Sequence, residues 1–151
     1  MRFKMKVLSL ILSLTMLLLL PAAYAMNPNN PADEEAVKQV IEDYVKGTDN
    51  QNADMLEKIL YPEGNYFNYN AITNKVSQMT NDQFLERVKK GQTGGWERQL
   101  NINSVDVNDN TAMAKIEVKD ARMKQHGYLT LVKEDGKWKI MSSAYTLETV
   151  K

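Results

Sequence analysis

Few residues of this sequence have side chains that could transfer a proton near neutral pH. His126 is the single histidine, and imidazole is the side chain whose ordinary pKa lies closest to neutrality. It could act as a general base, although its place at the start of a predicted strand also fits an exposed residue. Asp106 and Asp120 are carboxylates in or beside predicted strands, and burial in a pocket would raise the pKa of either. The flanking valines predict that Asp106 faces solvent, and the position of Asp120 fits a solvated turn, so no catalytic residue is assigned.

Tyrosine is the more numerous candidate for contacts with a ligand. Its ring offers apolar area and its hydroxyl one donor, which suits a pocket for an aromatic or carbonyl compound, although core and sheet packing explain the same residues. Trp96 follows two glycines and could be a lid, an interface anchor or a residue covering the core. Arg98 and Arg122 could bind an anionic ligand, although isolated arginines on strands are usually solvated. We predict that the ligand-binding residues are Tyr44, Tyr66, Tyr69, Trp96, His126 and Tyr128.

The composition excludes several kinds of site. The sequence has no cysteine and one histidine, which excludes disulfides, thiolate metal sites, a cysteine nucleophile and a site built on two histidines. Lysine plus arginine and aspartate plus glutamate both number 19, so the formal net charge is zero. Without a basic cluster, nucleic acid is not expected as a partner. There is no glycine-rich phosphate loop, no G-x-S-x-G and no H-E-x-x-H, and we expect no cofactor and no metal.

Residues 1–25 have the three parts of a secretory signal peptide. Basic residues precede an apolar run of 14 residues, and Ala23 and Ala25 form an A-x-A site. At ~1.5 Å per residue the run spans ~21 Å, short of the ~30 Å of a hydrocarbon core, which favours cleavage after Ala25 over a retained membrane anchor. We therefore expect an exported bacterial protein, periplasmic or extracellular, with a linker over 26–33 and one domain over 34–151.

Three later stretches have the apolar spacing of amphipathic helices. Asp33 is the expected N-cap of the first helix, and Gly47 its end. Asn52 is the expected N-cap of a short second helix. Thr80 opens the third with a T-x-x-Q capping box, and Gly91 suits its C-terminal end.

The rest of the chain has the two-residue alternation of strands. An aromatic strand is predicted over 64–71, and four antiparallel strands follow the third helix. Between 100 and 107 the alternation changes phase, which predicts a β-bulge near Asn103 and Ser104. The order of helices and strands predicts an α+β fold. The residues expected to share one face of the last strand are Trp138, Ile140, Ser142, Ala144 and Thr146, and those expected on its other face are Lys137, Lys139, Met141, Ser143 and Tyr145.

Four segments carry a resemblance to a known family: VKQVIEDY at 37–44, LYPE at 60–63, MTNDQF at 79–84 and YLTLVKEDGKWKI at 128–140. Over about residues 34–148 the chain resembles the nuclear transport factor 2-like superfamily, in its branch described as putative lumazine-binding and close to SnoaL-like proteins. The resemblance implies a cone in which three N-terminal helices pack on a curved, mostly antiparallel sheet. It also implies a pocket between sheet and helices and a homodimer formed through the sheet.

The resemblance does not imply a single activity, since this fold hosts enzymes, binding proteins and assembly domains. Where relatives often have an aspartate before the Tyr-Leu of the penultimate strand, this chain has His126 and Gly127. We expect an exported protein that binds a small apolar or aromatic molecule, with no reaction assigned. The alternatives are an enzyme of the SnoaL or ketosteroid isomerase kind, moving a proton or adding water in the pocket, and a protein-interaction module.

Overall fold

The structure is a computed structural model and describes residues 30–150. The predicted signal peptide and residues 26–29 of the predicted linker lie outside the described residues. Within them, no helix is long and apolar enough to cross a membrane.

The described residues form three helices and six strands. The helices are α1 (Pro31–Asp49), α2 (Ala53–Ile59) and α3 (Asn81–Lys89). The strands are β1 (Leu60–Asn70), β2 (Lys75–Thr80), β3 (Gln99–Asn108), β4 (Thr111–Lys119), β5 (Met123–Glu134) and β6 (Lys137–Thr149).

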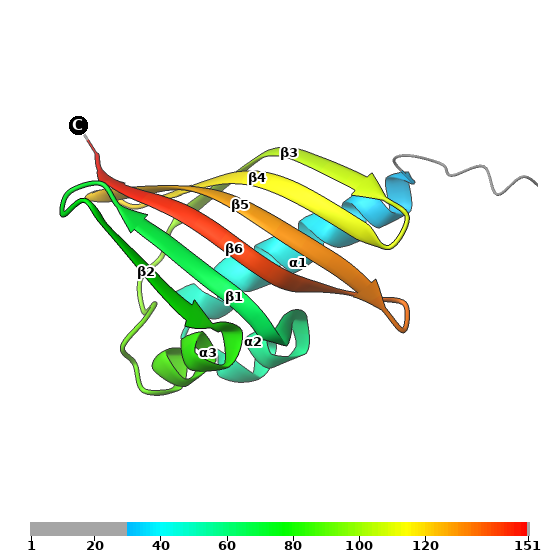
Figure 1. Ribbon diagram of the computed structural model, residues 1–151, viewed down its shortest axis with the longest axis horizontal. Coiled ribbons are helices and arrows are strands. Elements are labelled where there is room, and N and C mark those ends of the chain that lie inside the picture. The colour runs from blue at the N-terminus through cyan, green and yellow to red at the C-terminus, as the bar shows by residue number, and fades with distance from the viewer. Residues whose placement is uncertain (1–29, 151) are drawn as a thin grey trace, which may run out of the picture.

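All six strands belong to one sheet with the order β2-β1-β6-β5-β4-β3. The pairs are antiparallel except β1 with β6, which run parallel. Figure 1 shows the sheet curving around α1, which crosses one face, while α2 and α3 lie beside β1 and β2. This confirms the α+β fold with three helices packed on a curved, mostly antiparallel sheet. The face that packs on α1 is called the inner face below, and the opposite one the outer face.

Two helix caps are as the sequence predicts. The Asn52 side chain accepts a hydrogen bond from the backbone N–H of Met55 at 3.1 Å, which begins α2. Thr80 and Gln83 form the reciprocal capping box of α3. Gly91 follows α3 with φ +67°, a conformation that glycine adopts without steric cost.

The predicted cap of α1 is wrong. Asn30 is the N-cap, and its side chain accepts from the Ala32 N–H at 3.1 Å. Asp33 instead binds the other end of the molecule: it accepts from Lys133 Nζ at 2.6 Å and from Trp138 Nε1 at 3.1 Å. The carboxylate therefore ties the start of α1 to the β5–β6 hairpin.

The helix also continues past Gly47, to Asp49. A Cβ at Gly47 would lie 2.9 Å from Cδ2 of Leu56 in α2. The glycine therefore serves the close packing of α1 on α2 and does not end the helix.

No pattern in the sequence predicts β2. Its residues are mostly exposed, so their pattern has no alternation of buried and exposed positions. Backbone pairing with β1 and its place at the sheet edge define it instead.

The sheet contains two register shifts of consequence. One lies between Ile102 and Ser104 in β3 and confirms the predicted bulge. The other is a bulge in β6, where Met141 is the extra residue between the pairs Thr130–Ser142 and Leu131–Ile140. No pattern in the sequence predicts this second bulge. Because a bulge reverses the side-chain alternation, Ser143 and Tyr145 are buried on the inner face with Trp138 and Ile140. The predicted grouping of Ser142, Ala144 and Thr146 with Trp138 is therefore wrong.

The hydrophobic core lies between α1 and the middle of the inner face. Its fully buried large side chains include Ile41 and Leu56 from the helices and Ile116, Leu129 and Ile140 from the sheet. At ~1.5–3 kcal/mol for each large aliphatic side chain, this burial is the main favourable contribution to folding.

Candidate functional site

A cavity of about 430 Å³ lies between α1, α3, the 90–98 loop and the inner face of β4, β5, β6 and β1. Its volume falls within the ~300–1,000 Å³ typical of small-molecule sites. Its walls are Tyr44, Val45, Thr48, Tyr66, Phe84, Thr93, Gly94, Trp96, Arg98, Val118, Asp120, Arg122, Met123, Gln125, Tyr145 and Leu147.

One wall is a continuous set of aromatic rings. Phe84 of α3 stacks on Tyr66 of β1 with ring centroids 5.2 Å apart, and it also contacts Tyr44 of α1 with ring centroids 5.9 Å apart. Tyr66 in turn contacts Tyr145 of β6 at 5.6 Å. Such spacings are favourable for aromatic pairs, so the rings support one another and present a preformed surface to the cavity.

Tyr145 owes its position to a glycine. It pairs with Gly127 of β5, and a Cβ at Gly127 would lie 2.3 Å from the Tyr145 ring. The ring is buried, with 5% of the residue exposed. Its hydroxyl lies near the Tyr44 hydroxyl, and each affects the pKa of the other, but it makes no hydrogen bond of good geometry within the described residues. A buried hydroxyl without a hydrogen bond lowers the stability of the fold unless a water or a ligand bonds to it.

Arg98, just before β3, is the buried cation of the site, with 13% of its side chain exposed. Asp49 at the end of α1 holds one edge: Oδ1 accepts from Arg98 Nε at 2.5 Å, and Oδ2 from the backbone N–H of Arg98 at 2.9 Å. On the other edge, Nη1 donates to Oε1 of Gln125 at 3.3 Å. Nη2 is buried and has no partner within residues 30–150. The guanidinium is thus fixed, with donor capacity left over.

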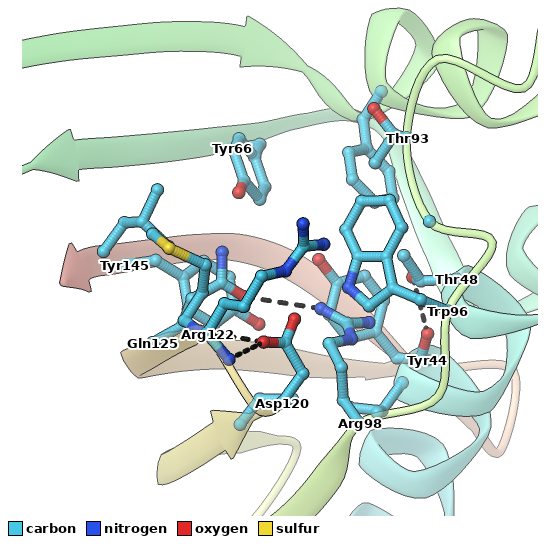
Figure 2. Close-up of a pocket in the computed structure, with 16 residues that line it drawn as sticks. Tyr44, Thr48, Tyr66, Thr93, Trp96, Arg98, Asp120, Arg122, Gln125 and Tyr145 are labelled. Carbon is cyan, nitrogen blue, oxygen red and sulfur yellow. Dashed lines mark hydrogen bonds between the residues drawn. The ribbon is translucent and has the colours of Figure 1, made fainter. Parts of the chain in front are cut away.

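Asp120 and Arg122 come from the turn between β4 and β5. Asp120 Oδ1 accepts from the backbone N–H groups of Arg122 at 2.7 Å and Met123 at 2.8 Å, which lowers the pKa of Asp120. Arg122 forms no ion pair within the described part of the chain. Figure 2 shows its side chain extending from this turn toward the space between Tyr66 and Trp96.

The 90–98 loop closes the remaining side, and its glycines fix its path. A Cβ at Gly94 would lie 1.8 Å from the carbonyl oxygen of Thr48, and φ is +79°. The Gly95 N–H donates to the Asp49 carbonyl at 3.1 Å, and the Gln51 amide to the Thr93 carbonyl at 3.3 Å. This brings Trp96, 49% exposed, to the cavity wall.

Burial raises the pKa of all three tyrosine hydroxyls of the site, Tyr44, Tyr66 and Tyr145, while the positive charge of Arg98 acts in the opposite direction. The tyrosines are therefore protonated at neutral pH and available as hydrogen-bond donors.

The structure brings three of the predicted ligand-binding residues together: Tyr44, Tyr66 and Trp96 line the cavity. The other three are elsewhere. Tyr69 is 40% exposed and donates from its hydroxyl to Asn74 at 2.9 Å. Tyr128 is 53% exposed, with Lys115 Nζ 6.0 Å from its ring centre.

His126 also lies apart from the cavity, in a charged cluster on the outer face. Its Nε2 is 3.0 Å from Oε1 of Glu148, and its Nδ1 is 3.6 Å from Oε2 of Glu117. Glu117 also pairs with Lys124 at 3.0 Å. Asp106 is exposed and pairs with Met113, as the flanking valines predicted. The outer face thus carries these side chains away from the cavity.

Sequence reasoning missed several cavity residues. Tyr145 was placed on the wrong face because the bulge at Met141 was not foreseen. Gln125 gave no signal of its own, since its role is to accept from Arg98. Asp120, expected in a solvated turn, does lie in a turn but also lines the cavity. Trp138 is 5% exposed, as expected for a core residue. Within the described residues, no cluster of histidine and carboxylate side chains could hold a metal ion.

The model of a protein family described as "Putative lumazine-binding" matches residues 32–146 of this chain. The chain belongs to this family. The match covers both the helices and the strands that form the cavity.

Solved structures show the same fold. A nuclear transport factor 2-like protein of unknown function from Silicibacter pomeroyi superposes with a TM-score of 0.70 and 21% identity, covering 80% of this chain and 99% of that one. One from Shewanella baltica gives 0.69 and 18%, covering 81% and 98%. A cystatin-like fold protein from Burkholderia xenovorans gives 0.66 and 13%, covering 83% and 99%. No curated protein sequence matches the chain. These likenesses establish the nuclear transport factor 2-like fold and leave the function to be argued from the cavity.

Proposed function

We propose that this protein binds a small, partly apolar molecule in the aromatic cavity. The observation that carries the proposal is the cavity itself: about 430 Å³, with one wall of stacked rings and two buried donors that make no hydrogen bond of good geometry within residues 30–150. A site with apolar walls and a few convergent polar groups is typical of small-molecule binding.

The polar groups indicate why an occupant is favoured. Nη2 of Arg98 and the hydroxyl of Tyr145 have lost their contact with bulk water and have gained no partner of good geometry in the described residues. A ligand oxygen that accepted from either would remove a desolvation cost of ~1–3 kcal/mol. The rings of Tyr66, Phe84 and Trp96 would cover the apolar part of the same ligand.

Proton-transfer or hydration chemistry of the SnoaL or ketosteroid isomerase kind is the second candidate, and Asp120 is the observation that favours it, because this carboxylate lines the cavity. Hydrogen bonds from two backbone N–H groups hold its pKa below the ordinary value. A carboxylate in that state is ionised at neutral pH, but its lowered pKa makes it a weaker base as well as a poor proton donor. We therefore prefer binding over catalysis.

The description of the family points to lumazine, a flat bicyclic molecule with two carbonyl oxygens, as one compound of suitable chemistry. Its rings match the aromatic wall, and its oxygens are acceptors for Arg98 and Tyr145. Lumazine is therefore included below as a probe.

The test is a fluorescence titration with N-phenyl-1-naphthylamine, a neutral probe whose emission rises in an apolar site, followed by displacement with lumazine. We expect saturable binding that Leu147→Trp weakens at least about tenfold, since Leu147 is half-buried in the cavity wall. Ile72→Trp is the matched control, because Ile72 is 58% exposed in the turn after β1. No saturable binding, or equal loss in both variants, would overturn the proposal.

We also propose that two copies associate through the outer face. Exposed apolar side chains gather there, with Met113 55%, Tyr128 53% and Met141 43% exposed, and patches of this kind often mark interfaces. Light scattering of Tyr128→Lys against the unaltered chain would test it: a dimer that the substitution dissociates is expected, and a monomeric unaltered chain would contradict it.

Export to the periplasm or beyond is likewise a proposal, supported by the charge and hydropathy pattern of residues 1–25. Fractionation of cells that make the full chain should recover a shortened protein outside the cytoplasm. A full-length cytoplasmic protein would overturn it.

A further inference from the structure

We propose that the ligand of this cavity carries an anionic group, a carboxylate on a flat apolar body, and that Arg98 and Arg122 together bind it. The inference rests on the proposed function and adds the charge of the ligand.

Arg98 contributes a fixed donor. Its Nε and its backbone N–H donate to Asp49, and its Nη1 donates to Gln125. With these donors occupied by protein acceptors, Nη2 is the nitrogen of the guanidinium that has no acceptor in the described residues. Because guanidinium is planar and cannot lose its proton, the direction of Nη2 is set by the other bonds. The arrangement holds the Nη2 amino group in a fixed position in the cavity wall, with its N–H donors unused.

Arg122 contributes the second charge. It lines the cavity, and within residues 30–150 its guanidinium has no carboxylate partner. Its backbone N–H is anchored on Asp120 at 2.7 Å, so the start of the side chain is held. Figure 2 shows Arg122 and Arg98 both reaching the region beside Trp96, from the β4–β5 turn and from the segment before β3.

Two carboxylates must be set against these cations. Asp49 does not line the cavity; it pairs with the opposite edge of Arg98. Asp120 does line it, and its Oδ1 already accepts two backbone N–H groups. Among the charged side chains that line the cavity in the described residues, two are cations and one is a carboxylate. Because Asp49 offsets the charge of Arg98, the four charges balance, and what is left for a ligand is donor capacity: Nη2 of Arg98 and the guanidinium of Arg122 have no carboxylate partner in the described residues. Partly dry surroundings strengthen any bond that these groups make.

A neutral carbonyl ligand is the alternative. It would satisfy Nη2 of Arg98 or the Tyr145 hydroxyl, but it would give the Arg122 guanidinium no carboxylate to pair with directly. A carboxylate has two oxygens and can accept from both arginines at once, as charge-assisted hydrogen bonds of roughly twice the ordinary strength. The number and kind of donors therefore favour the anion.

The test compares two probes of nearly the same shape, 2-naphthoate and 2-naphthamide, by isothermal titration calorimetry. We expect the acid to bind at least about tenfold tighter than the amide at low ionic strength. Its advantage should shrink as salt is added, because screening weakens charge pairing. Arg122→Gln should weaken binding of the acid severalfold more than binding of the amide. Lys137→Gln, which removes an exposed cation at the start of β6, should change neither.

The outcomes separate the two proposals. If the amide binds as well as the acid, or Arg122→Gln weakens both equally, the anion inference fails while the binding function stands. If neither 2-naphthoate nor 2-naphthamide binds but N-phenyl-1-naphthylamine does, the anion inference also fails. If none of the three binds, the proposed function itself fails.

Discussion

At the scale of single residues, the site depends on polar atoms that the fold buries without satisfying. The hydroxyl of Tyr145 is one, and it is buried because the bulge at Met141 turns Tyr145 inward and Gly127 leaves room for its ring. Neither cause can be read from a simple two-residue alternation. The sequence therefore shows a set of tyrosines with the right chemistry, but its alternation predicts the wrong face for Tyr145.

Tyr145→Phe tests whether this hydroxyl serves a ligand. The substitution removes a buried donor that has no partner of good geometry, so the free energy of unfolding should stay equal or rise by up to about 1 kcal/mol in urea denaturation. Ligand affinity should fall several-fold in the same variant. A loss of 2 kcal/mol or more of stability would mean that the hydroxyl is bonded within the protein and would contradict its role as a free donor.

At the scale of elements, the caps of α2 and α3 and the bulge of β3 follow from the sequence because each depends on residues close together in the chain. Asn52 and Thr80 bond to N–H groups three residues away. The edge strand β2 and the start of α1 do not follow, because β2 is defined by pairing with β1, and Asp33 is bonded to residues about a hundred positions later.

Asp33→Asn tests the tie between α1 and the β5–β6 hairpin. Hydrogen bonds from Lys133 and Trp138 lower the pKa of Asp33 in the folded state. The stabilisation is therefore complete above the unfolded pKa of about 3.9 and is lost as the pH falls through the lower folded value. We expect the variant to be about 1 kcal/mol less stable at pH 7, with a difference that narrows below about pH 4. A difference that stayed constant over this range would contradict the ionic tie.

Gly94→Ala tests whether the 90–98 loop shapes the cavity. Both Gly94 and Gly136 have positive φ, +79° and +74°, so alanine costs ~1–2 kcal/mol of backbone strain at either site. Only Gly94 has a backbone atom within 2 Å of the added Cβ, the Thr48 carbonyl oxygen, whereas Gly136 has nothing within 4 Å. Gly94→Ala should therefore weaken N-phenyl-1-naphthylamine binding at least about fivefold, while Gly136→Ala should lower stability alone. Equal binding by the two variants would show that the loop does not shape the site.

At the scale of the whole molecule, the fold and the function rest on different observations. The family match over residues 32–146 and the superposed structures establish the fold. The function depends on which side chains the inner face directs into the cavity, and that set combines residues from two helices, four strands, a turn and a loop. Local patterns in a sequence show the types of these residues, and their convergence becomes visible only in three dimensions.

The most direct test uses the two tryptophans of the chain as reporters. Trp96 lines the cavity, whereas Trp138 is buried far along the sheet, with its indole N–H bonded to Asp33. In a ¹H–¹⁵N spectrum, with Trp138→Phe to assign the two indole signals, added 2-naphthoate or N-phenyl-1-naphthylamine should shift the Trp96 signal and leave the Trp138 signal in place. A shift of Trp138 alone, or of neither signal at saturating probe, would contradict the claim that this cavity is a ligand site.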